Sequence, residues 1–533
     1  MLTKRFWRYI CLAGIFMLFA ITRLWQLSSL PFGLHIDEAG MAYDAYCLSQ
    51  YGVDRYLKPW PVYLLNFGGG QNALYTFVCA GMIRIFGFGV RVIRMPAVIS
   101  SLFNLVFGMK LVKKMYPGRA FMPVVAGGLM AACPYFIMAG RFGLESNLML
   151  GMSTIFLYCL TAAIESGNAV RYMLAGLVGG FLLYTYAPVY LILPLFLVLT
   201  LIYLLRIKKF SLKGWIAMAV PMGILALPLI LVQIVNMFDL EEFQFGCFTI
   251  TKLAFYRASE LGVLTFDKLA LALKSIFIGD GLNYNSIPGY ANLYLVTILP
   301  AALGFGLGIV KLWKSFRERE TGFNGRAVFV TVFLWFLSML LFECHIESNV
   351  NKTNGIFFSV IVLAAEGLDA LRMICGRMAN SGKNAGRRKK GAEIAVAAVL
   401  CCIYICGFAR FGRYYYGGFY SAETFPLSNF DVTVSEALDF IEQDPILRTK
   451  VTQMAEKEIY YAVSTLENPY ELQVKLGTGD GIRYNNHWIG CLGEITDAYN
   501  YIVRDGFEEY CGQLREAGFT EERFVKYSLF YKK

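Results

Sequence analysis

Long apolar segments alternate with short polar ones along residues 1–409 of this chain. Several of the apolar runs approach or exceed about 20 residues, the length at which a helix spans a bilayer. Backbone groups in lipid must be satisfied within the chain, so these runs are predicted to be helices. We expect eleven spans, near residues 9–28, 91–112, 120–139, 147–164, 172–187, 189–205, 214–236, 291–310, 327–343, 354–371 and 392–409.

The Lys and Arg residues between these runs predict the orientation of the spans. Cytoplasmic loops carry an excess of Lys and Arg, and a cytoplasmic N-terminus places every dense basic cluster on the inside. These clusters lie at residues 113–119, 206–213, 311–326 and 387–390. With eleven spans the C-terminus is then extracytoplasmic, as expected for a multi-pass protein of the cell membrane.

Residues 72–88 are apolar enough to be a twelfth span, but Arg84 and two glycines interrupt them. Counting this segment as a span would move Lys113 and Lys114 to the outside. We therefore expect an amphipathic helix lying in the interface. The alternative is a true span with the topology reversed after it.

The composition changes after residue 409. Residues 410–533 contain 13 Lys and Arg against 19 Asp and Glu, while the rest of the chain is strongly basic. Their pattern predicts a small α/β domain. Strands are expected at 450–455, 459–464, 498–504 and 523–531, and helices at 433–441 and 506–518. The predicted domains are a transmembrane catalytic domain, 1–409, and an extracytoplasmic accessory domain, 410–533.

Overall composition agrees with an integral membrane protein: 57% of residues are hydrophobic, 16% are charged, and mean hydropathy is +0.51. Soluble domains are about 45–50% apolar and about 25% charged. The net charge of +11 comes from residues between spans, so no nucleic-acid partner is expected. The chain has only three His, so no multi-His metal site is expected, and its thirteen Cys are scattered without a Cys/His cluster. The sequence contains no P-loop, which argues against an ATP-driven pump. No cofactor is predicted with certainty, and a divalent cation is left open.

Polar side chains gather in the loops expected outside, beginning with the adjacent acids Asp37 and Glu38 after the first span. The others are His35, Tyr43, Asp54, Arg91, Arg94, Arg141, Glu145, Tyr284, Asn285, Asn349 and Lys352. Carboxylates mixed with Arg and Lys are typical of a base beside a phosphate site. A sugar transfer outside the cell needs a membrane-borne donor, because nucleotide sugars are absent there. The acceptor hydroxyl then needs a carboxylate to take its proton, and the phosphate leaving group needs cations.

Several short motifs occur in an order that resembles one known family. They are Asp37-Glu38-Ala39, Tyr43-Asp44-Ala45, Gly52-Val53-Asp54, Trp60-Pro61-Val62-Tyr63, Val90-Arg91-Val92-Ile93-Arg94-Met95-Pro96, Arg141-Phe142-Gly143-Leu144-Glu145, Tyr284-Asn285 with Pro288-Gly289, and Asn349 with Asn351-Lys352 and Asn354. Together they resemble the GT-C glycosyltransferases, in the branch of protein O-mannosyltransferases and the lipid A aminoarabinose transferase. Two positions depart from that pattern, because Lys352 stands where Arg is expected and Glu145 where many relatives carry Asp.

The resemblance implies a GT-C fold and an inverting transfer from a polyprenyl-phosphate sugar, with Asp37 as the base. Asp37, Glu38 and Glu145 are the expected catalytic residues, and Arg91, Arg94, Arg141 and Lys352 the expected donor-phosphate ligands. Expected substrate contacts are His35, Tyr43, Asp54, Tyr284, Asn285 and Asn349. The acceptor stays open between a protein, a glycan and a glycolipid.

Simpler interpretations of these residues remain. The acidic pair could cap a helix, the two arginines of the second span could anchor it at the interface, and Arg141 with Glu145 could form a structural ion pair. A transporter or flippase of lipid-linked saccharides is the main functional alternative, followed by a polymerase or ligase. A transporter should carry charges or broken helices near the membrane midplane.

Overall fold

The structure is a computed structural model in which two compact units are distinguished. The described residues are 2–66, 69–253, 262–282, 284, 286–317, 322–379, 385–419, 430–431, 434–474, 482–484, 486–490 and 492–533. The first unit, here the helical unit, comprises Met1–Trp25, Arg94–Leu240 and Lys252–Tyr414. The second, here the mixed unit, comprises Gln26–Ile93, Glu241–Thr251 and Tyr415–Lys533.

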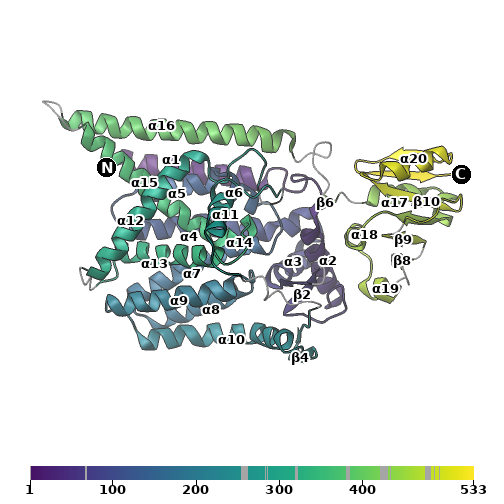
Figure 1. The fold of residues 1–533 in the computed structure, drawn as a ribbon, viewed down its shortest axis with the longest axis horizontal. Helices are drawn as coiled ribbons and strands as arrows, with labels where there is room; N and C mark the ends of the chain where they lie inside the picture. Colours follow the sequence, from purple (N-terminus) through teal and green to yellow (C-terminus); the bar gives the residue numbers. More distant parts are fainter. Residues whose placement is uncertain are drawn as a thin grey trace. The chain divides into compact units, whose positions relative to one another are not determined.

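The helical unit is a bundle of long apolar helices (Figure 1). Its helices are α1 (Leu2–Leu24), α4 (Val90–Met115), α5 (Phe121–Ala132), α6 (Pro134–Ala139), α7 (Ser146–Ser166), α8 (Ala169–Leu183), α9 (Val189–Arg206), α10 (Leu212–Met237), α11 (Phe266–Phe277), α12 (Ile298–Arg317), α13 (Gly325–Glu343), α14 (Val350–Thr353), α15 (Phe357–Met378) and α16 (Ala385–Tyr414). Within the described residues, eight helices are long and apolar enough to cross a membrane. The first residues of α4, before Arg94, belong to the mixed unit.

Each of the eleven predicted spans overlaps a helix of this unit, although not every one is a single long helix. Helices α5 and α8 are shorter apolar helices, and the segment predicted at 120–139 is divided into α5 and α6. Pro134 causes this division, because it has no N–H with which to continue the helix hydrogen bonds. The prediction of a polytopic helical protein is confirmed.

The carbonyls released at the α5–α6 break are satisfied by side chains. The guanidinium of Arg23 donates to the carbonyl oxygens of Met130 at 2.8 Å and Ala131 at 2.5 Å. The hydroxyl of Tyr294 donates to the carbonyl of Ala132 at 2.8 Å. Since unpaired backbone groups in an apolar environment are costly, Arg23 holds the broken helix in place and is itself completely buried.

Glycines set the close approach of α12 and α15. A Cβ added to Gly304 would overlap the backbone carbonyl of Leu363, and one added to Gly367 would overlap that of Pro300. Small residues at facing positions let two helix backbones pack closely, which is a common device in membrane bundles.

The mixed unit joins segments from three parts of the chain. Its first segments form β1 (Leu34–His35), α2 (Ile36–Tyr51), β2 (Tyr63–Asn66), β3 (Gly69–Asn72), α3 (Leu74–Phe86), β4 (Phe243–Phe245) and β5 (Phe248–Ile250). Its last segment forms β6 (Phe430–Asp431), α17 (Ser435–Gln443), β7 (Val451–Met454), α18 (Glu458–Thr465), α19 (Pro469–Val474), β8 (Ile482–Tyr484), β9 (His487–Ile489), β10 (Tyr499–Arg504), α20 (Glu508–Glu516), β11 (Thr520–Arg523) and β12 (Tyr527–Tyr531).

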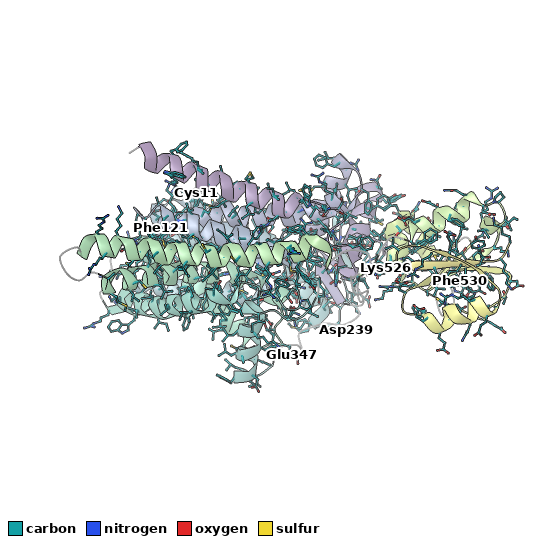
Figure 2. All side chains as sticks on the ribbon, turned by 90° about the horizontal axis from the view of Figure 1, so that it is seen from above. Cys11, Phe121, Asp239, Glu347, Lys526 and Phe530 are labelled. Atoms are coloured by element: carbon teal, nitrogen blue, oxygen red, sulfur yellow. The ribbon has the colours of Figure 1, made fainter. Side chains whose placement is uncertain are left out.

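The C-terminal segment contains a six-stranded sheet in the order β11-β12-β10-β7-β9-β8. Strands β10, β7 and β9 are parallel neighbours, and the outer strands are antiparallel. One hydrophobic core of this part surrounds Tyr501, Leu514, Phe519 and Phe530, the last of which is labelled in Figure 2. The prediction of an α/β C-terminal part is confirmed.

One predicted element of the C-terminal part has the wrong type. The strand predicted at 459–464 is wrong, because these residues belong to α18, whose apolar side chains Ile459–Val463 are all buried. A short apolar run that is buried throughout has no periodicity to separate strand from helix. Thr433, the first residue of the helix predicted at 433–441, lies outside the described residues. The helical and mixed units are defined by the contacts within them and not by their location in or outside a membrane. The predicted boundary between a transmembrane domain, 1–409, and an extracytoplasmic domain, 410–533, therefore stays a prediction.

Candidate active site

The acidic pair lies in the first turn of α2, within the mixed unit. The Nδ1 atom of His35 accepts the backbone N–H of Asp37 at 3.2 Å, and the backbone N–H of His35 donates to Oε2 of Glu38 at 3.0 Å. These reciprocal bonds form a capping box that satisfies donors at the helix end. The pair therefore does cap a helix, but only the carboxylate of Glu38 takes part in the cap. Glu38 is completely buried, whereas the side chain of Asp37 is 36% exposed.

His35 is a neutral imidazole in this arrangement. Burial lowers the pKa of His35 below its usual value, although the nearby charges of Asp37 and Glu38 oppose the shift. Because Nδ1 accepts a backbone hydrogen bond, the ring hydrogen is assigned to Nε2. His35 therefore positions the acidic pair through its neutral tautomer.

A line of polar side chains leads from Asp37 into the interior of the mixed unit. The side-chain amide of Asn66, at the end of β2, donates to Oδ1 of Asp37 at 3.0 Å. Its carbonyl oxygen accepts a 2.7 Å hydrogen bond from Nη2 of Arg55. The same Nη2 lies 3.3 Å from Oδ2 of the buried Asp44. One oxygen of Asp37 is thus fixed by Asn66, and Asn66 is in turn fixed by an ion pair.

Gly40 makes room for this line of contacts. A Cβ built on Gly40 would lie 2.8 Å from Oδ1 of Asn66 and 3.1 Å from Nη2 of Arg55. Such short distances require the neighbours to shift, and both neighbours are held by hydrogen bonds. The residue two positions after the acidic pair is therefore glycine because two side chains cross the helix backbone there.

Asp54, predicted to contact substrate, is buried behind the site. Its Oδ1 accepts the backbone N–H groups of Tyr56 at 2.9 Å and Lys58 at 2.8 Å. Burial, together with the charge of Asp44, raises the pKa of Asp54 to about 7. These bonds make Asp54 the organiser of its own loop.

Tyr43 and the C-terminal segment meet on the other side of α2. The buried hydroxyl of Tyr43 donates to the backbone carbonyl of Glu467 at 2.9 Å. The ring of Tyr51 lies 6.3 Å from that of Tyr470. Strand β6 pairs with β1 immediately before the acidic pair. The segment after α18 therefore packs against the helix that carries Asp37.

A second group of predicted residues lies in the helical unit. Arg94 and Arg141 are both completely buried, and Nη1 of Arg141 donates to the carbonyl of Thr22 at 2.9 Å. Glu145 is the N-cap residue of α7 and is largely buried. Arg141 and Glu145 are therefore enclosed by protein and not spread over a surface loop.

Two segments about two hundred residues apart meet in this group. The Asn354 amide donates to Oδ1 of Asn147 at 3.2 Å, and the Ser146 hydroxyl donates to Oδ1 of Asn351 at 3.2 Å. The structure thus brings the Arg141–Glu145 turn beside the predicted 349–354 motif.

The first residues of that motif form a short capped helix. The Asn349 side chain accepts the backbone N–H of Lys352 at 3.0 Å and so caps α14. The Nζ atom of Lys352 donates to the carbonyl of Glu347 at 3.2 Å, and the side chain is half-buried. Lys352 is thus the most open of the cations in this group.

Sequence reasoning missed three of the site's neighbours. Asn66 is an uncharged amide in a loop, so no charge pattern indicated it. Arg23 lies within the first predicted span, where nothing in the sequence indicates its hydrogen bonds to the carbonyls at the α5–α6 break. Glu343 ends α13, is completely buried and lies beside Ser348 and Lys352.

The other predicted residues stand apart from these groups. Arg91 is exposed near the start of α4, and Tyr284 is half-buried in a turn. Asn285 lies outside the described residues. The part of the chain that the structure describes contains no group of three or more His, Cys, Asp or Glu side chains able to hold a metal ion. The question of a divalent cation stays open, as in the sequence analysis.

Comparison with known proteins gives one family match. Residues 71–235 match the family described as dolichyl-phosphate-mannose-protein mannosyltransferase. This match covers less than half of the chain. No curated protein sequence matches the chain.

Solved structures match over nearly the whole length. ArnT from Cupriavidus metallidurans in the apo state has a TM-score of 0.53 at 12% identity, covering 99% of this chain and 98% of that chain. The same protein bound to undecaprenyl phosphate has a TM-score of 0.51 at 12% identity, covering 98% and 97%. AglB from Archaeoglobus fulgidus, an archaeal oligosaccharyltransferase in complex with an inhibitory peptide and a dolichol-phosphate, has a TM-score of 0.50 at 12% identity, covering 87% and 64%. These likenesses confirm the GT-C fold.

Proposed function

We propose, on the premise that this chain has the fold of the GT-C membrane glycosyltransferases, that it transfers a sugar from a polyprenyl-phosphate donor to an acceptor hydroxyl on the outer face of the membrane. The similar structures contain undecaprenyl phosphate and a dolichol-phosphate, which supports a lipid-phosphate donor. The partial match to a mannosyltransferase family supports sugar transfer. We propose a cytoplasmic N-terminus and an extracytoplasmic C-terminal domain, as the positive-inside rule predicts.

The observation that carries this proposal is the unequal environment of the two acids. Asp37 keeps part of its carboxylate open while Asn66 holds one of its oxygens, and Glu38 is buried in the helix cap. A general base must reach the proton that it abstracts. Of the pair, Asp37 meets this requirement and Glu38 supports it.

The reaction is a single displacement with inversion at the anomeric carbon. Asp37 takes the acceptor hydroxyl proton as the acceptor oxygen bonds to the anomeric carbon. The bond from that carbon to the donor phosphate breaks, and the electron pair leaves on the polyprenyl phosphate. Lys352 is the proposed direct phosphate ligand, because its side chain is only half-buried whereas Arg94 and Arg141 are completely buried. Arg94 and Arg141 add positive potential from buried positions, which stabilises the developing charge.

The remaining predicted residues keep supporting roles in this proposal. Glu145 is a second acid at the start of α7, and Arg91 an exposed cation at the start of α4. His35, Tyr43, Asp54, Tyr284, Asn285 and Asn349 are proposed to shape the substrate site. The acceptor is a protein, a glycan or a glycolipid.

Purified protein in detergent tests this function against a transporter. With a panel of polyprenyl-phosphate sugars and candidate acceptors, a glycosyltransferase releases free polyprenyl phosphate and glycosylated acceptor. A flippase leaves every donor intact, because detergent offers no second leaflet. Lys352→Gln should lower release at least about tenfold, while the exposed Lys209→Gln should match the unmodified protein. Intact donor throughout, or equal rates for the two variants, would contradict the proposal.

A further inference from the structure

A cavity of about 400 Å³ lies between α1, α5, α15 and α16 of the helical unit. Its wall is almost entirely aliphatic and aromatic, and its polar side chains are confined to Tyr404, Asp369 and Arg372. The space arises where small residues face one another, including Gly128 on α5 and Ala397 on α16. A Cβ built on Gly128 would have nothing within 4 Å.

The cavity is elongated along the helices. Its lining runs from Phe121 to Ala132 on α5 and from Val396 to Phe408 on α16. At a rise of 1.5 Å per residue these stretches span about 16–18 Å. That length is a little over half of the roughly 30 Å hydrocarbon core, the depth of about one leaflet. The shape fits an extended aliphatic chain.

One end of the cavity is charged. Arg372 donates to Asp369 at 2.8 Å and to Glu393 at 2.5 Å, and its guanidinium lies 5.1 Å from the ring centroid of Phe121. Arg119 also pairs with Asp369. Two turns before the apolar lining of α16, the exposed cations Arg387, Arg388, Lys389 and Lys390 follow one another. Arg119 and Arg372 pair with Asp369 and Glu393 at this end, and the four exposed cations near the start of α16 add positive charge to this part of the helical unit.

We propose that this cavity is a phospholipid site, holding an acyl chain of an anionic phospholipid whose phosphate lies against the basic end. Apolar cavities take up apolar ligands, which supply the dispersion contacts that the lining side chains otherwise lack. Basic segments beside a membrane helix attract anionic lipid headgroups. Phe121, which is labelled in Figure 2 and begins α5, lines the cavity together with residues of α16. The lipid fills the space between them and holds α16 against the bundle.

The charged end argues for a phospholipid over the polyprenyl tail of the donor. Arg119 precedes α5 and Arg141 follows α6, so they mark opposite ends of one helical segment. The donor phosphate is assigned to the Arg141 end, whereas the cavity carries its charge at the Arg119 end. With the proposed orientation, this end faces the cytoplasmic leaflet.

The test measures lipid bound to the full-length protein, by mass spectrometry of purified samples and by thermal unfolding with added lipid. The probes are phosphatidylglycerol, phosphatidylcholine and undecaprenyl phosphate. Phosphatidylglycerol should co-purify and raise the unfolding temperature the most, increasingly with its concentration. Equal effects of phosphatidylglycerol and phosphatidylcholine, or retention of undecaprenyl phosphate alone, would overturn the proposal.

Two kinds of variant separate the cavity from general lipid binding. Gly128→Leu places a branched side chain in the cavity and should strongly reduce the gain from phosphatidylglycerol. Gly306→Leu on α12 is the matched control, because nothing lies within 4 Å of its Cβ either and it does not line the cavity. Changing Arg387, Arg388, Lys389 and Lys390 to Gln leaves the packing untouched and should weaken phosphatidylglycerol binding at least about tenfold.

If Gly128→Leu fails to fold, the four-Gln variant and the comparison of the three lipids on the unmodified protein still test the proposal. If both glycine variants bind phosphatidylglycerol as the unmodified protein does, the cavity is not the site. If the four-Gln variant keeps its preference for phosphatidylglycerol, the headgroup assignment is wrong. None of these readouts uses sugar transfer, so their failure would leave the proposed glycosyltransferase activity untouched.

Discussion

The side-chain amide of Asn66 donates a 3.0 Å hydrogen bond to Oδ1 of Asp37 and connects it to the Arg55–Asp44 ion pair. Asp37 is therefore oriented from two directions, by this amide and by the helix cap around His35. A carboxylate fixed through one oxygen leaves its other oxygen for a proton. This relationship gives the proposed base a defined position without burying it.

Removing the amide should reduce turnover without abolishing it. Asn66→Ala frees the Asp37 carboxylate to rotate, and a misplaced catalytic group can lose up to about 100-fold in rate. We expect kcat to fall about tenfold to 100-fold, with little change in the KM for donor. A merely structural role would change donor binding and stability instead, so a KM effect without a kcat effect would contradict this assignment.

Gly40→Ala should disturb the contacts of Asn66 with Asp37 and Arg55, because both Asn66 and Arg55 lie against α2 at Gly40. The added methyl would lie 2.8 Å from Oδ1 of Asn66, and overpacking of this kind typically costs about 1–3 kcal/mol. We expect a lower unfolding temperature and reduced turnover. Gly81→Ala on α3 is the matched control, because nothing lies within 4 Å of its Cβ. Identical behaviour of the two variants would show that the crossing at Gly40 is not tight.

Arg23→Ala should destabilise the helical unit. It leaves the carbonyls of Met130 and Ala131 without their donors, and each buried group left unsatisfied costs about 1–3 kcal/mol. The control is Arg8→Ala, an exposed position on the same helix. The unfolding temperature should fall for Arg23→Ala only. If the unfolding temperature fell equally in the two variants, the Arg23 hydrogen bonds at the α5–α6 break would contribute nothing to stability.

Asp54 predicts a pH dependence of stability with a definite sign. Its pKa is about 7 in the folded protein, against about 3.8 as the usual value, so the folded state binds the extra proton between these limits. Stability from this group therefore falls as pH rises through that window. Asp54→Asn removes the fall. The unfolding temperature of the variant relative to the unmodified protein should rise between pH 4 and pH 8, and a constant difference would contradict the raised pKa.

The architecture was largely predictable because apolar length and basic loops are strong signals. Every predicted span overlaps a helix, and the α/β part at the C-terminus was expected from the change in composition. The break at Pro134 was not, since a proline inside an apolar run ends a helix only where neighbouring side chains satisfy the released carbonyls. The strand predicted at 459–464 failed because burial on all sides removes the periodicity.

The candidate site was predictable in its charged members and not in their geometry. The motif placed Asp37 and Glu38 together, but it could not say which would be buried, because that depends on the His35 cap. Asn66 and Gly40 carry no charge, and their importance follows from a contact between α2 and β2. The buried state of Arg94 and Arg141 likewise depends on packing that hydropathy does not encode.

The central claim is that Asp37 is the general base, and paired isosteric variants test it most directly. Asp37→Asn keeps the size of the side chain and cannot accept a proton at neutral pH, whereas Glu38→Gln changes the helix cap. The measurement is turnover of a polyprenyl-phosphate sugar by purified protein, with donor affinity determined in parallel. Asp37→Asn should lose at least about 100-fold in rate with donor affinity retained, and Glu38→Gln should lose less. Near-normal turnover by Asp37→Asn, or a severe loss in Glu38→Gln alone, would contradict the account.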